Sequence, residues 1–158
     1  VAAFRDATLF KVCYGFGLRR REVAMLEVTD FHRNAKAPEF GGYSVCSVRW
    51  GKAAKGSPPR RRSVLGVFPS ITGVLTEYVD QVRPVYEPGQ RRMLWPTERG
   101  GRLSVGYVNA RFREYADDLG LPRELHPHCL RHYADGRVMR PVGVCGLVTA
   151  VLVVIVSA

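Results

Sequence analysis

The stretch Leu125-His126-Pro127-His128-Cys129-Leu130-Arg131-His132 decides how the rest of the chain is interpreted. It predicts a helix start, because Pro127 lacks the N–H that would stay unpaired in a first turn and His126 can precede it. His128 and Arg131 are three residues apart and so share a face near the helix N-terminus. That end already carries free N–H groups and partial positive charge. Cationic side chains added there indicate a site for an anion, most simply a phosphate.

A second helix start that carries arginines is predicted near the beginning of the chain. The stretch Gly15-Phe16-Gly17-Leu18-Arg19-Arg20-Arg21-Glu22-Val23-Ala24-Met25-Leu26 has a glycine-containing stop followed by three arginines in a first turn. Glu22 lies three residues after Arg19, so its carboxylate can fix that guanidinium. Val23 and Leu26 supply an apolar face that docks the helix on a core. Two such helix starts can converge on one phosphate.

The middle of the chain predicts a β-hairpin. Residues 43–50 alternate and favour a strand, residues 51–59 form a turn, and residues 60–68 return as a second strand. Cationic side chains at such a tip suit contact with a DNA backbone or groove, and here they are Lys52, Lys55, Arg60, Arg61 and Arg62. For the three arginines the alternative is a solvated basic edge strand, which protects against aggregation.

Further segments have apolar side chains at helical spacing and are predicted to be scaffold helices: residues 2–14, 71–82 and 105–119. Ser104 can cap the last of these helices, and residues 93–96 resemble a short strand. Arg111 and Arg113 are expected to face solvent or a phosphate. The predicted fold class is α+β, mainly α-helical with a small antiparallel β-sheet or hairpin.

Composition narrows the range of partners. The 158 residues suit one domain, and 46% hydrophobic residues is a globular value. The net charge of +10 favours a polyanion, and no long amphipathic basic segment points to a membrane surface instead. The cysteines have no C-x-x-C spacing and are expected to be reduced, as in a cytoplasmic protein.

Three blocks of sequence, in this order, resemble the tyrosine recombinase (phage integrase) family. They are Gly17-Leu18-Arg19-x-x-Glu22-Val23-x-x-Leu26-x-x-x-Asp30, then Val48-Arg49-Trp50-Gly51-Lys52 with Arg60-Arg61-Arg62-Ser63-Val64-Leu65, then His128-x-Leu130-Arg131-His132. The resemblance implies that residues 1–132 form a partial catalytic domain with the fold of that family.

The resemblance also implies a chemistry. A tyrosine of these enzymes attacks a DNA phosphodiester, which gives a 3′-phosphotyrosyl link and frees a 5′-hydroxyl, with no metal or nucleotide cofactor. Arg19 and Arg131 would hold the non-bridging oxygens of that phosphate. Lys52 would protonate the departing 5′ oxygen, with Lys55 as the alternative lysine, and His128 would assist proton movement or donate a hydrogen bond.

Supporting roles and partners follow from the same resemblance. Glu22 would orient Arg19, and His132 would tie its helix to neighbouring elements. The implied partners are double-stranded DNA and further recombinase subunits, because family members act as tetramers on two duplexes.

The nucleophile that the resemblance requires is not found. The family places its tyrosine well downstream of the second arginine, whereas the last tyrosine here is Tyr133, two residues after Arg131 on the same predicted helix. Residues 142–158 carry no charge and are rich in valine. We therefore expect residues 133–158 to be a non-family apolar tail, such as an out-of-frame product, and the chain to be inactive or dependent on another chain.

Two other interpretations remain beside a recombinase domain. The first is a non-enzymatic DNA-binding remnant. The second is a zinc site formed by His126, His128, Cys129 and His132. The i, i+4 spacing of His128 and His132 suits zinc. However, no glutamate stands at the metalloprotease position and the sequence has no second Cys/His cluster, so we favour an interpretation without a metal.

Overall fold

The computed structural model describes residues 1–51, 56–66, 68–86, 89 and 91–134, with side chains in those ranges up to residue 130. Lys52 and Lys55 lie outside the described residues, as does the tail from residue 135 onward. Arg131 and His132 are described as part of a helix backbone only.

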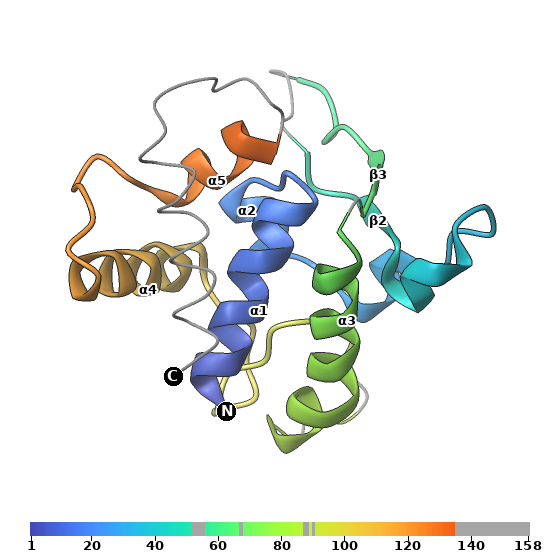
Figure 1. Ribbon diagram of the computed structural model, residues 1–158, viewed down its shortest axis with the longest axis horizontal. Coiled ribbons are helices and arrows are strands. Elements are labelled where there is room, and N and C mark those ends of the chain that lie inside the picture. Colours follow the sequence, from blue (N-terminus) through green and yellow to red (C-terminus); the bar gives the residue numbers. More distant parts are fainter. Residues whose placement is uncertain (52–55, 67, 87–88, 90, 135–158) are drawn as a thin grey trace.

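A nearly buried helix, α1 (Ala2–Gly15), lies at the centre of the helical part of the fold (Figure 1). Its buried residues point in several directions, as expected of a helix that is covered on more than one side. Helices α3 (Pro69–Glu77) and α5 (Pro127–Ala134) pack against α1. Helix α4 (Val105–Asp118) joins them through the edge-to-face pair of Phe10 and Phe112, whose ring centroids are 5.6 Å apart.

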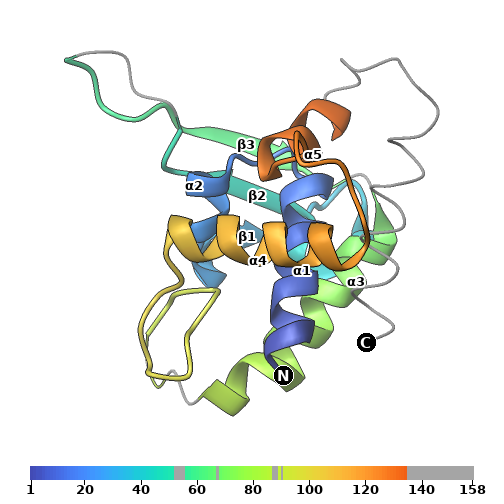
Figure 2. The same cartoon turned by 90° about the vertical axis from the view of Figure 1, so that its left-hand side faces the viewer.

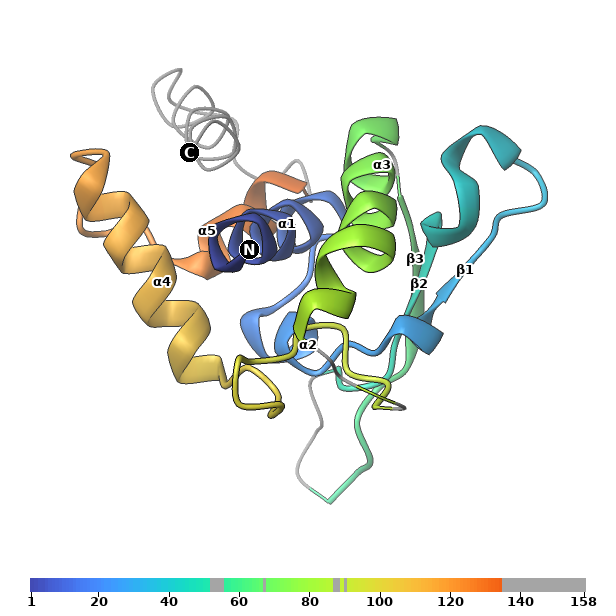
Figure 3. The same cartoon turned by 90° about the horizontal axis from the view of Figure 1, so that it is seen from below.

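A three-stranded antiparallel sheet lies beside α3, on the side away from α4 (Figure 3). Its order is β1 (Phe31–His32), β2 (Val45–Val48) and β3 (Arg62–Leu65). The register places Val48 opposite Arg62 and Val45 opposite Leu65. The predicted α+β class and the hairpin are confirmed, although both strands are shorter than expected.

Short helical turns connect these elements. Helix α2 (Arg20–Ala24) is followed by a 3₁₀ turn, η1 (Val28–Asp30), and a second 3₁₀ segment, η2 (Pro38–Tyr43), precedes β2. The predicted helix 71–82 is regular only to Glu77 and continues as a wider π turn, Tyr78–Val82, and a 3₁₀ turn, Arg83–Tyr86. Pro84 has no N–H for the next α-helical hydrogen bond, so a regular helix cannot pass through it.

The segment 93–96 does not form the strand that its sequence predicts. It makes two isolated bridges instead, Glu27 with Met93 and Pro96 with Arg102. Pro96 donates no ladder hydrogen bond, which limits any extension of pairing. The segment has another role, because the buried Trp95 indole donates a 2.8 Å hydrogen bond to the Val23 carbonyl and so anchors α2.

Helix α4 confirms one prediction and corrects another. Its first turn is capped as predicted, since Tyr107 N–H donates to Ser104 Oγ over 3.0 Å. Arg111 was expected to face solvent or a phosphate, but its Nε donates to the buried Asp6 carboxylate over 2.8 Å. A buried carboxylate needs a counter-charge, and this need overrides the exposure expected from helical spacing.

Across the described ranges, no helix combines the length and apolar character required to cross a bilayer.

Candidate phosphate-binding site

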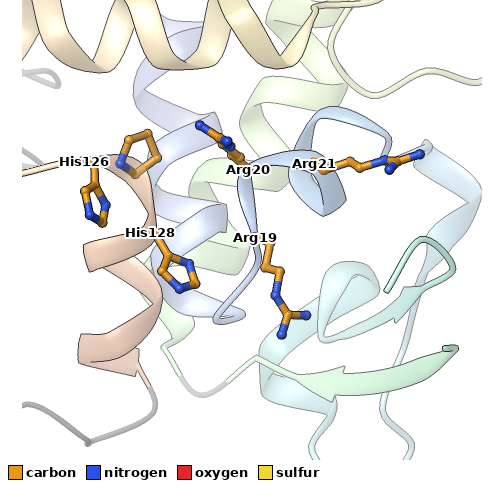
Figure 4. A pocket seen from close by; sticks show the side chains of 6 residues that line it. Arg19, Arg20, Arg21, His126 and His128 are labelled. Atoms are coloured by element: carbon orange, nitrogen blue, oxygen red, sulfur yellow. The ribbon is translucent and has the colours of Figure 1, made fainter. Parts of the chain in front are cut away.

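The starts of α2 and α5 lie side by side and enclose a pocket of about 390 Å³ (Figure 4). Among the described residues, its lining comes from these two helix starts and consists of Arg19, Arg20, Arg21, His126, Pro127 and His128. No carboxylate is among these lining residues. The two basic helix starts therefore line one pocket, and their convergence on a phosphate stays a prediction.

The turn between α1 and α2 delivers Arg19 to this pocket. Gly17 has a φ of 57°, a left-handed conformation that glycine adopts without strain. The Leu18 N–H then closes the end of α1 by donating to the Cys13 carbonyl over 2.9 Å. Arg19 follows as the residue that caps α2, so its side chain leaves the backbone at the mouth of the pocket.

Arg19 is held by Glu22, as its sequence spacing predicts. The Arg19 backbone N–H donates to Glu22 Oε2 over 2.8 Å, and Arg19 Nη1 donates to Oε1 over 3.0 Å. Within the described part of the chain, Nε and Nη2 of Arg19 donate to no protein acceptor, and 36% of the side chain is exposed. An anion in the pocket can take these remaining donors.

Glu22 itself is almost completely buried and is shared with Arg62. Arg62 Nη1 and Nη2 donate to Oε1 and Oε2 of Glu22 over 2.8 and 3.0 Å. Burial alone would raise the pKa of the Glu22 carboxyl, but the hydrogen bonds from Arg62 and Arg19, with the charge of Arg62, outweigh it and lower that pKa. Glu22 is therefore a carboxylate at neutral pH.

Sequence reasoning did not find this contact of Arg62. The alternation of side chains along the strand could have indicated it, because Arg62 lies on the opposite face from its exposed neighbours Arg61 and Ser63. The partner was not visible in the sequence, because Glu22 lies 40 residues earlier. Contact of Arg62 with DNA stays a prediction.

Helix α5 begins at Pro127, as predicted, and presents histidines to the pocket. The His126 and His128 rings are stacked with centroids 6.2 Å apart, and Cys129 Sγ lies 3.5 Å from His126 Nδ1. Figure 4 shows His128 and Arg19 reaching toward the same side of the pocket from their two helices. Arg131 follows one helical turn after His128 in α5, with no side-chain position described.

The outer part of the hairpin projects away from the body of the domain (Figure 2). Arg60 and Arg61 are exposed there, and the Gly51 N–H donates to the Arg60 carbonyl over 3.1 Å to close the hairpin. Lys52 and Lys55 fall in the part that is not described, so their predicted roles remain predictions. Among the described side chains, no three His, Cys, Asp or Glu residues are grouped to hold a metal ion.

The sequence matches the model of the phage integrase family over residues 1–140. The fold and the match together show that this chain belongs to the phage integrase family. The match includes residues 133–140, which follow the proposed boundary of the domain.

Curated relatives and solved structures agree with this assignment. The chain is 32% identical over 130 residues to the tyrosine recombinase XerC of Shewanella amazonensis, and 27% identical over 128 residues to XerD of Corynebacterium glutamicum. These alignments cover 82% and 81% of this chain but only 38% and 37% of the relatives. The chain therefore spans less than half of their length.

Similar folds occur in XerA recombinase (TM-score 0.61, 19% identity) and in XerH site-specific recombinase solved with a palindromic difH substrate (TM-score 0.59, 23% identity). The matches cover 83% and 82% of this chain, and 41% and 33% of those chains. These likenesses support the fold.

Proposed function

We propose that this chain is the DNA-phosphate-binding part of the catalytic domain of a site-specific tyrosine recombinase. The observation that carries the proposal is the pocket between the starts of α2 and α5. Arginine and histidine line it, Glu22 holds Arg19, and within the described residues Nε and Nη2 of Arg19 have no protein acceptor. The difH substrate of the XerH neighbour supports DNA as the ligand.

The proposed reaction centre combines pocket residues with two groups taken from the family motif. Arg19 and Arg131 hold the non-bridging oxygens and stabilise the charge of the phosphorane as it forms. His128 donates a hydrogen bond to the phosphate or moves a proton. Lys52 transfers a proton to the 5′ oxygen as the bond from phosphorus to that oxygen breaks.

The exposed arginines of the hairpin are proposed to bind the DNA backbone beside this centre. Arg60 and Arg61 directly precede β3 in the hairpin and are exposed, as a phosphate contact requires. Lys55 belongs to the same proposed surface by its place in the sequence. His132 is proposed to support α5, and additional recombinase subunits are proposed partners on DNA.

We further propose that the 158-residue chain holds DNA without cleaving it. The last tyrosine, Tyr133, is two residues after Arg131 in α5 and so belongs to the same helix as the residue it would have to face across the phosphate. Losing a nucleophile removes several orders of magnitude of rate. This feature favours the second candidate function, a DNA-binding module without cutting activity.

The test measures duplex binding and covalent attachment on the same preparation. Fluorescence anisotropy should show Arg19→Ala and Arg131→Ala each weakening duplex binding by about tenfold, the loss of one charged hydrogen-bond donor. The exposed Arg33→Ala removes the same charge outside the pocket and should weaken binding far less. If Arg19→Ala and Arg131→Ala both bind as tightly as Arg33→Ala, the proposed site does not bind phosphate.

A nicked suicide duplex separates the two candidate functions. A denaturing gel should show no protein–DNA adduct with the 158-residue chain. An adduct that survives denaturant would show that the chain supplies a nucleophile, and would overturn the proposal that it binds without cutting.

A further inference from the structure

We propose that Arg62 is a positioning residue, which acts on phosphate through Glu22 and Arg19 and so ties the hairpin to the pocket. This inference rests on the function proposed above. It departs from the expectation that Arg62, like Arg60 and Arg61, contacts DNA.

The hydrogen bonds around Glu22 carry the argument. Each carboxylate oxygen accepts one bond from each arginine: Oε1 from Nη1 of Arg19 and Nη1 of Arg62, Oε2 from the Arg19 backbone N–H and Nη2 of Arg62. A two-pronged guanidinium fixes the plane of the carboxylate, which a single ammonium cannot do. The plane of Glu22 in turn sets the direction in which the Arg19 guanidinium points.

The sheet register turns Arg62 toward this carboxylate. Arg62 pairs with Val48, and residues directly opposite each other lie on the same face of a sheet. Val48 is 1% exposed, so this is the face that packs on the core, whereas Arg61 and Ser63 are exposed. Arg62 is thereby directed to the interior side of the hairpin, and its side chain is 33% exposed against 1% for Glu22.

A second contact ties the other strand to the same segment of chain. Arg49 follows β2 and binds Asp30 through Nε and Nη2 over 2.5 and 3.1 Å, with Glu27 Oε2 a further 3.1 Å from Nη2. Asp30 and Glu27 lie just after α2, and Glu22 lies within it. Both strands of the hairpin are thus fixed to residues 22–30, the segment that also orients Arg19.

The decisive experiment compares Arg62→Lys, Arg62→Ala and Arg33→Lys in salt-dependent binding of duplex DNA. Lysine keeps the charge that a phosphate contact needs but loses the two-pronged grip on Glu22. We expect Arg62→Lys to weaken binding about tenfold, the order of one charged hydrogen bond, with little change in the salt slope. Arg33→Lys makes the same exchange at an exposed position outside the proposed site and should stay close to the parent chain. In an Arg19→Ala background the Arg62→Lys loss should disappear.

A direct phosphate contact makes the opposite predictions. Arg62→Lys would then bind nearly normally, Arg62→Ala would reduce the salt slope by about one, and both effects would persist without Arg19. That pattern would overturn the inference. Amide NMR spectra that match the parent chain establish that each variant is folded, and Glu22→Gln, which keeps the side-chain shape, provides a second route to the same loss of orientation.

A readout without DNA separates this inference from the proposed function. The Nε–H signal of Arg19 can be assigned by its loss in Arg19→Ala. It should shift in Arg62→Lys and not in Arg33→Lys, whether or not Arg19 binds DNA. If the Arg19 signal does not move in Arg62→Lys, the positioning role is contradicted. If the signal moves in Arg62→Lys but Arg19→Ala binds DNA with normal affinity, only the proposed function of the pocket is contradicted.

Discussion

Two arginine–carboxylate networks in this domain differ in how completely their arginines are used. In the interior, Arg5 is fully buried beside Asp6, and each nitrogen of its guanidinium has an acceptor: Asp6, the Pro96 carbonyl with Glu98, and the Tyr107 hydroxyl. At the pocket, Arg19 is partly exposed, and only one of its guanidinium nitrogens, Nη1, donates a hydrogen bond to Glu22.

The interior network continues into α4, where Arg111 also binds Asp6. Arg111 Nε donates to the second oxygen of Asp6 over 2.8 Å, and its Nη2 donates to the Tyr115 hydroxyl over 2.6 Å. Burial opposes the charge of Arg111, yet the hydrogen bonds from its guanidinium to Asp6 and Tyr115 raise its pKa. A network with its donors satisfied inside the protein holds helices together and has little capacity left for a ligand.

We propose that exposure and unused donors, rather than ion pairing itself, distinguish a ligand-binding arginine from a structural one. Both networks contain a buried carboxylate with two arginines, so residue types alone do not separate them. If the distinction holds, variants of the interior network should lose stability, whereas variants of Arg19 should lose DNA affinity.

Removal of Asp6 should have the largest effect on stability. Asp6→Ala leaves Arg5 as a buried charge without its main counter-charge, and breaking such a pair costs about 3–5 kcal/mol. Urea unfolding should show this loss in the free energy of unfolding. DNA affinity, corrected for the folded fraction, should be unchanged, and a loss of affinity would mean that the interior network also serves the site.

Glu22→Gln should have an intermediate effect that depends on pH. Loss of the buried charge should lower the free energy of unfolding at pH 7 by about 1–3 kcal/mol, the cost of leaving charged donors poorly paired. The folded-state pKa of Glu22 is lowered, so its stabilisation is present above the unfolded value of about 4.3 and is lost as pH falls through the folded value.

Unfolding of the parent chain and Glu22→Gln between pH 7 and pH 3 measures that dependence. The gap between their free energies of unfolding should narrow as the solution becomes acidic. A gap that stays constant over the whole range would show that the charge of Glu22 does not stabilise the fold.

Arg19→Ala should separate binding from stability. Its ion pair is more than a third exposed, and Arg62 still holds Glu22, so the loss of unfolding free energy should not exceed about 1 kcal/mol. The same variant should lose DNA affinity, which is the reverse of Asp6→Ala. Chemical denaturation and anisotropy on one preparation compare the two quantities.

The smallest effect is expected at Glu114, an exposed partner of Arg111. Its side chain is 56% exposed, and surface pairs of this kind contribute about 0–0.5 kcal/mol. Glu114→Ala should therefore unfold almost as the parent chain does. A loss comparable with that of Asp6→Ala would show that exposure is a poor guide in these networks.

Local signals in the sequence predicted a large part of the fold and the outline of the site. Helix starts at Arg19 and Pro127 and the cap at Ser104 depend on residues within one turn, so sequence spacing is enough to place them. The hairpin followed from the alternation of residues 43–50 and the turn predicted at residues 51–59. The contact of Arg19 with Glu22 is also local, three residues along the chain.

Long-range choices of partner were not predictable in this way. Glu22 also pairs with Arg62 and Asp6 with Arg111, across 40 and 105 residues, and many other arginines had the same charge to offer. The hydrogen bond from the Trp95 indole to the Val23 carbonyl was missed for the same reason, because only the packed fold brings these two residues together. A strand had been predicted at residues 93–96 instead. Pairing partners are set by topology, whereas helix starts are set by neighbouring residues.

A double-mutant cycle between Arg19 and His128 tests the central claim most directly, because these residues reach one pocket from different helices. Duplex affinity would be measured for Arg19→Ala, His128→Ala and the double variant. If both residues bind the same phosphate, the double variant should lose less than the sum of the single losses, with a coupling energy of about 0.5 kcal/mol or more. Losses that add within about 0.3 kcal/mol would contradict a shared phosphate site.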